Sequence, residues 1–110
     1  MRVKYYLTLS GRSPVEEFLL GLSKTTAKEV ADAISLLEYG QKVGMPLSRN
    51  LSSIYPGLHE PRFRDEHGQV RLVYYIKKFE AIYLVHAFRK KTQSLPKKEI
   101  QLILKRIREV

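Results

Sequence analysis

The chain has 110 residues, of which 20 are Lys or Arg and 11 are Asp or Glu, so its formal net charge is +9 at neutral pH. This length predicts a single domain spanning residues 1–110. Hydrophobic residues make up 44% of the chain, which argues against intrinsic disorder, and the absence of cysteine excludes disulfides, thiol nucleophiles and cysteine-based zinc sites. Because no stretch of roughly 18 apolar residues and no apolar leader segment is present, we expect a cytoplasmic protein that does not enter a membrane.

The positive charge is concentrated in the second half of the chain. Residues 57–110 hold 13 basic and 6 acidic side chains, whereas residues 1–56 hold 7 basic and 5 acidic ones. Such an excess is typical of proteins that bind polyanions, because basic side chains that neutralise phosphates release condensed counterions. A basic surface that serves only solubility is the alternative.

The first half predicts one strand and two helices. Apolar residues alternate over residues 3–9, which indicates a half-buried strand. Ser13-Pro14-Val15-Glu16 and Thr26-Ala27-Lys28-Glu29 have the pattern of capping boxes, and they predict helices over 14–22 and 26–42 that form an antiparallel hairpin. Gly44, Pro46 and the polar run 48–50 then predict an irregular connection.

The second half predicts a sheet and a last helix. Three segments rich in Val, Ile, Tyr and Phe, near 58–64, 69–77 and 81–89, are separated by short turns and predict an antiparallel meander. The apolar residues from Ile100 to Ile107 recur at helical spacing and predict an amphipathic C-terminal helix. The whole order predicts an α+β domain in which the helices cover one face of a mostly antiparallel sheet.

Basic residues on this meander are the candidate site. Arg71 alternates with the apolar residues of its strand, so we expect it on the open face, where it can hold a phosphate and where the fold does not depend on it. Arg62 and Arg64, two residues apart, share a face of the preceding strand and are expected near Arg71. An arginine that merely pairs with Glu60 or Asp65 is the alternative interpretation.

Further candidates flank these arginines. Lys90 and Lys91 follow the last strand, beside Arg89, and can direct ammonium groups at the same patch. His59 and Glu60 are expected to approach a bound substrate, whereas His86 is expected to be packed among apolar neighbours. The three histidines lack the spacing of zinc ligands, so we predict no metal and no cofactor.

Three segments in order resemble a known toxin family. They are Glu60-Pro61-Arg62, then Gly68-Gln69-Val70-Arg71-Leu72-Val73-Tyr74, then the segment from His86 to Pro96 that contains Lys90-Lys91-Thr92. This succession resembles the phage-derived, HigB-like branch of the RelE/ParE toxin superfamily.

The resemblance implies an mRNA endonuclease of a type II toxin–antitoxin system, which acts without metal on the ribosome and is neutralised by a cognate antitoxin, commonly a small helix-turn-helix protein. Arg62, Arg71 and Lys90 fall on positions that carry basic catalytic residues in RelE-like nucleases. No tyrosine follows Tyr83, although several relatives place one near the C-terminus. The general base is therefore left to Glu60, His59 or a lysine.

Two other functions fit the same residues. A gyrase-inhibiting toxin that resembles ParE would act by binding a protein, and a phage regulatory protein would bind RNA without cutting it. Arrest of translation without an SOS response would distinguish the nuclease from the gyrase inhibitor.

Overall fold

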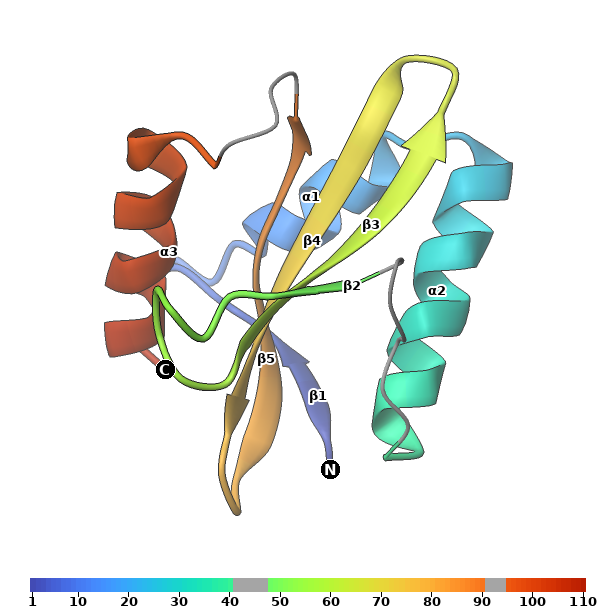
Figure 1. The fold of residues 1–110 in the computed structure, drawn as a ribbon. Helices are drawn as coiled ribbons and strands as arrows, with labels where there is room; N and C mark the ends of the chain where they lie inside the picture. Colours follow the sequence, from blue (N-terminus) through green and yellow to red (C-terminus); the bar gives the residue numbers. More distant parts are fainter. Residues whose placement is uncertain (41–47, 91–94) are drawn as a thin grey trace.

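A computed structural model describes residues 1–40, 48–90 and 95–110. Five strands and three helices occur in these residues: β1 (Val3–Tyr5), α1 (Pro14–Leu20), α2 (Lys24–Glu38), β2 (Ser48–Asn50), β3 (Leu58–Asp65), β4 (Gly68–Lys77), β5 (Ala81–Lys90) and α3 (Lys97–Arg108). The chain is thus a mixed α+β protein built on one five-stranded sheet (Figure 1).

The sheet has the strand order β1-β5-β4-β3-β2. The meander β3-β4-β5 is antiparallel, as the sequence predicts, and places Arg62 opposite Arg71 and Arg71 opposite Phe88. Two edge strands complete it: β1 pairs in parallel with β5, and β2 pairs antiparallel with β3. The expected irregular connection at 48–50 is wrong, because these polar residues form β2 by backbone pairing without any apolar alternation.

The first strand is shorter than expected. β1 ends at Tyr5, and the next residue, Tyr6, is buried, while Leu7 and Leu9 are exposed. The alternation over residues 3–9 therefore does not describe one continuous strand. Tyr6 instead continues beside β5 through a hydrogen bond from its N–H to the carbonyl of Leu84.

The helix starts differ from the expected capping boxes. Ser23, not Thr26, caps α2, because the Ser23 Oγ accepts a hydrogen bond from the N–H of Thr26. The side chain of Ser13 makes no such bond at the start of α1. α1 runs across the sheet and α2 runs along it, so the two helices do not form the expected hairpin (Figure 1).

Helices cover both faces of the sheet, which corrects the expectation of one covered face. The α1–α2 side holds a core of Val15, Val30, Leu37, Leu72, Tyr74, Ile82, Leu84 and Ala87. The α3 side holds a second core of Tyr6, Leu51, Leu58, Val73, Val85, Ile103 and Ile107. The even-numbered apolar residues of β4 face α1 and α2, whereas Val73 and Tyr75 face α3.

Candidate active site

The strand register collects charged residues on the face of the sheet that α3 also covers. Opposed residues of neighbouring strands lie on the same face, and alternate residues of one strand share a face. Arg49 is opposite Glu60, Arg62 is opposite Arg71, Arg64 is opposite Gln69, and Gln69 is opposite Lys90. We call Arg49, Glu60, Arg62, Arg71 and Lys90 the cationic cluster.

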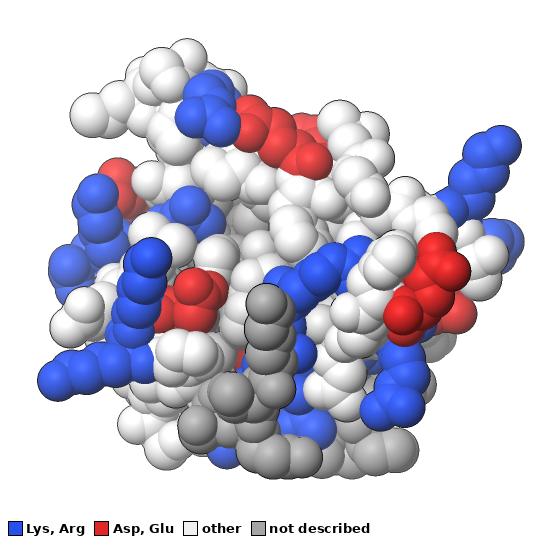
Figure 2. All heavy atoms as spheres, turned by 90° about the horizontal axis from the view of Figure 1, so that it is seen from above, with Lys and Arg blue, Asp and Glu red and all other residues white. Residues whose placement is uncertain are grey.

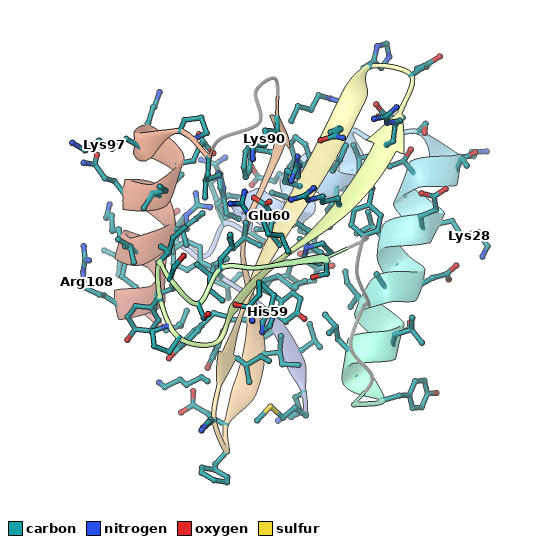
Figure 3. All side chains as sticks on the ribbon, viewed as in Figure 1. Lys28, His59, Glu60, Lys90, Lys97 and Arg108 are labelled. Atoms are coloured by element: carbon teal, nitrogen blue, oxygen red, sulfur yellow. The ribbon has the colours of Figure 1, made fainter. Side chains whose placement is uncertain are left out.

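The cluster lies on the part of the sheet between α3 and α2. Figure 3 shows Glu60 and Lys90 there, while Lys28, Lys97 and Arg108 point outward from their helices. In the view from above, basic side chains reach the middle of the surface as well as its rim (Figure 2). With four cations around one carboxylate, the cluster is suited to an anion.

Arg71 is the buried centre of this cluster. Its side chain is 3% exposed and its Nη1 donates a hydrogen bond to Oε1 of Glu60 at 2.8 Å, while Glu60 itself is completely buried. Its Nη2 donates to Oε1 of Gln69 at 2.5 Å. The expectation of an open position is therefore wrong: Arg71 is on the face that alternation predicts, but it pairs with Glu60 beneath the surface.

Lys90 is a second buried cation, and it is 7% exposed. Burial lowers the pKa of Lys90 below its usual value. Glu60 opposes this effect, while the surrounding cations, which are Arg71, Arg49 and Arg62, lower the pKa further. Unlike Arg71, Lys90 has no hydrogen-bond partner for its Nζ among the described residues.

Unsatisfied polar atoms concentrate in this cluster. The buried side-chain atoms without a hydrogen-bond partner in residues 1–40, 48–90 and 95–110 are Ser13 Oγ, Glu60 Oε2, Arg62 Nε, Arg71 Nε and Lys90 Nζ. All but the first belong to the cluster. Since native proteins satisfy nearly all buried polar groups, these four atoms of the cluster are available to a ligand or to water.

Two predicted site residues lie on the opposite face of the sheet. His59 shares the face of Tyr74 and stacks on its ring with centroids 5.1 Å apart. Arg89 is opposite Val70 and makes two hydrogen bonds of 2.7 Å to the carboxylate of Asp65. Neither residue faces the cationic cluster. Lys91 lies outside the described residues.

The remaining predicted residues are near the cluster, and one member had not been predicted. Arg62 is partly buried, and Arg64 is exposed on the same face of β3. Arg49 lies on β2, a strand whose sequence lacks the apolar alternation that would predict it. Only the pairing of β2 with β3 brings Arg49 opposite Glu60, so no motif spacing could have identified it.

A separate polar network attaches α3 beside the cluster. His86 pairs through Nε2 with the carboxylate of Glu99, and Arg106 donates to the carbonyl of Val85 at 2.8 Å. The His86 ring also stacks on Phe88, with centroids 4.8 Å apart. The expectation that His86 is a packed, hydrogen-bonded histidine is confirmed.

The described residues contain no group of three or more His, Asp or Glu side chains placed to hold a metal ion. In the same part of the chain, no helix has the length and apolar composition needed to span a bilayer.

Comparison with known protein families identifies the chain. The model of the family described as Phage derived protein Gp49-like (DUF891) matches residues 17–108. The chain belongs to this family. The Gp49-like family is part of the RelE/ParE-like toxin–antitoxin superfamily, is associated with endoribonuclease activity in general, and implies a cognate antitoxin. No curated protein matches this Gp49-like chain.

Proposed function

We propose that this protein is the toxin of a type II toxin–antitoxin pair, in the HigB-like branch of the superfamily, and that it cleaves mRNA on the ribosome without a metal ion. The observation that carries the proposal is the buried Lys90 amine, which lies among arginines and has no hydrogen-bond partner within residues 1–40, 48–90 and 95–110. Membership of the Gp49-like toxin family supports the biological role.

The chemistry of RNA cleavage fits such a cluster. When a ribose 2′-OH attacks the adjacent phosphate, negative charge accumulates on a phosphorane, one proton is removed and another is donated to the leaving oxygen. Exposed Arg49 and partly exposed Arg62 are the groups that first bind the phosphate. Fixed cations in a poorly hydrated site then stabilise the additional charge more effectively than water does.

Lys90 is better placed than Arg71 to contact the phosphate. Lysine has a flexible stem, and the Lys90 amine has no partner to lose among the described residues when it moves. Arg71 would have to release both Glu60 and Gln69. We therefore assign Lys90 to phosphate binding and proton transfer, for which a lowered pKa is favourable, and Arg71 to a fixed charge beneath it.

The general base is confined by the same geometry. His59 faces the other side of the sheet, so of the candidates from the sequence Glu60 and a lysine remain, and Lys90 is a lysine of the cluster. The Oε1 atom of Glu60 accepts a hydrogen bond from Arg71, so we assign Glu60 to the positioning of this arginine.

Mapping the 5′ ends of transcripts after brief expression tests the proposal. We expect new ends within translated reading frames, and a loss of about a hundredfold or more in cleavage rate for Lys90→Ala. Lys97→Ala is the matched control, because Lys97 is an exposed lysine that points away from the cluster (Figure 3). Unchanged transcript ends together with an SOS response would contradict the nuclease and favour gyrase inhibition.

A further inference from the structure

A cleft opens at the end of β4 that lies away from Lys90, where the loop before β3 rests against the strand. The cleft has a volume of about 520 Å³. Tyr55 and Tyr75 meet there edge to face with ring centroids 5.5 Å apart, and Tyr55 remains 37% exposed. We call this hollow the aromatic cleft, and the described residues that line it are Tyr55, Pro56, Gly57, Tyr75, Ile76 and Lys78.

The backbone of Gly57 holds the cleft in shape. The N–H of Ile76 donates a hydrogen bond to the carbonyl of Gly57 at 2.9 Å, which attaches the loop to β4. Gly57 has a φ of 87°, and a Cβ atom at this position would lie 2.8 Å from the carbonyl oxygen of Ile76. Glycine permits this close approach, so the backbone that carries the two tyrosines is fixed before any ligand binds.

Phe79 adds a third ring at the tip of the β4–β5 hairpin, directly after Lys78 in the chain (Figure 1). The N–H of Glu80 donates to the carbonyl of Lys77 at 3.1 Å, so residues 77–80 form the turn. Phe79 is fully exposed and has a φ of 63°, a left-handed conformation that is costly for a bulky side chain. Its ring therefore contributes no burial to the fold at a position that favours glycine, which indicates a role outside the packing of the chain.

The charge beside these rings is positive. Lys78 is exposed at the cleft, and no carboxylate is among the described residues that line it. The nearby carboxylate of Glu80 pairs with Lys77 at 3.2 Å and accepts a hydrogen bond from Tyr83. Exposed aromatic rings beside lysine are suited to single-stranded nucleic acid, because bases stack on the rings while phosphates contact the lysine. The net charge of +9 favours this class of ligand over a neutral or basic peptide.

The aromatic cleft and the cationic cluster lie on the same face of β4. Arg71, Val73 and Tyr75 alternate along the strand, and Val73 and Tyr75 both face α3. Arg71 and Tyr75 are separated by four residues, which is roughly 13 Å at about 3.3 Å per residue. One extended RNA strand can therefore reach both places.

We infer that the aromatic cleft and Phe79 form a second binding site for the RNA strand whose phosphate the cationic cluster holds. Unstacked bases lie against Tyr55 and Phe79, and a phosphate lies at Lys78. That this strand is the cleaved transcript rests on the proposed function. The second site makes affinity depend on nucleotides beyond the cleaved position.

The test measures binding of single-stranded RNA to the full chain, with 2′-O-methyl riboses that block cleavage at the cluster. Phe79→Gly removes the ring and relieves the left-handed backbone, so the variant should melt no lower than the wild type. We expect it to bind a strand of about 12 nucleotides about tenfold more weakly, the scale of one lost stack between a base and an aromatic ring. Tyr39→Gly is the matched control, because Tyr39 is an 84% exposed aromatic residue at the end of α2. It should change the affinity by no more than about twofold.

Two further ligands show whether Phe79 contacts unpaired bases of a longer strand. A fragment of about three nucleotides, which occupies the cluster alone, and a duplex, whose bases are already stacked, should each bind Phe79→Gly as tightly as wild type. Equal affinity of Phe79→Gly and Tyr39→Gly for the long single strand would overturn the second site, as would an equal loss with the duplex or the fragment.

The source of the RNA and the nuclease are tested separately. A contact of Phe79 that is detected with purified ribosomes but not with the free strand would assign the ring to the ribosome and overturn the inference. Binding of the free strand that depends on Phe79, in a chain that leaves unmodified mRNA uncut on the ribosome, would retain the second site and refute the proposed nuclease.

Discussion

Replacing Arg71 should destabilise the protein as well as inactivate it. The Glu60–Arg71 pair is almost completely buried, with the two side chains 0% and 3% exposed. Arg71→Met leaves the Glu60 carboxylate in the interior without its main partner, which costs about 3–5 kcal/mol for a buried pair. Because a domain is stable by only about 5–15 kcal/mol, this is a large part of the total. The expectation that Arg71 could be removed with the fold unaffected is revised accordingly.

A double-mutant cycle separates the structural role of the pair from its role in catalysis. Replacing both residues, as Glu60→Leu with Arg71→Met, removes both charges and should restore most of the stability that either single change loses. Urea unfolding of the wild type, the two single variants and the double variant measures the coupling energy between the two residues. We expect a coupling energy of several kcal/mol, similar to the cost of breaking a buried ion pair. The folded double variant should still lose about a hundredfold in cleavage because the fixed charge is gone. Additive losses of stability, or a fully active double variant, would refute this reasoning.

Three further outcomes follow from the charges. If Lys90 is the general base, cleavage should rise with pH through its lowered pKa, and Lys90→Arg should move that rise to higher pH, whereas Lys97→Arg should not. A pH–rate profile measures this. Arg89 holds the pKa of Asp65 at about 2, so Arg89→Ala should raise the pKa of Asp65 toward 3.8 in an NMR titration without affecting cleavage. The stability that the wild-type pair contributes should be lost as pH falls from about 3.8 toward 2. Burial lowers the pKa of His86, so the melting temperature should fall as pH drops below about 6.5, and His86→Gln should flatten that dependence.

Alternation along the strands correctly predicted which residues share a face but not how deeply they lie. Arg71 is opposite in facing to Val70 and Leu72, as expected from the pleat. Its burial depends on Glu60 of β3 and Lys90 of β5, which belong to the two neighbouring strands, and on Gln69 of its own strand. Such a depth is a property of the assembled sheet, because the pleat of a single strand specifies orientation only.

The placement of α3 illustrates a second limit. Its apolar stripe was clear from the sequence, but a stripe does not specify which face of a sheet it covers. A β-bulge in β5 made the face that α3 covers harder to predict. Val73 is opposite His86 and Tyr74 is opposite Leu84, so Val85 is an extra residue in β5. This bulge puts Val85 and His86 on the same side, toward α3, and it breaks the strict alternation that sequence reasoning assumes.

The attachment of α3 argues against inhibition by a partner that displaces this helix. Ile103 and Ile107 are buried in the core beneath α3, and fully exposing such side chains costs about 1.5–3 kcal/mol each. Displacement would also break the bonds of Arg106 to Val85 and of Glu99 to His86. A partner that removes α3 must compensate for all of these contacts, so a partner that covers the cationic cluster while α3 stays in place reaches the same inhibition with less rearrangement.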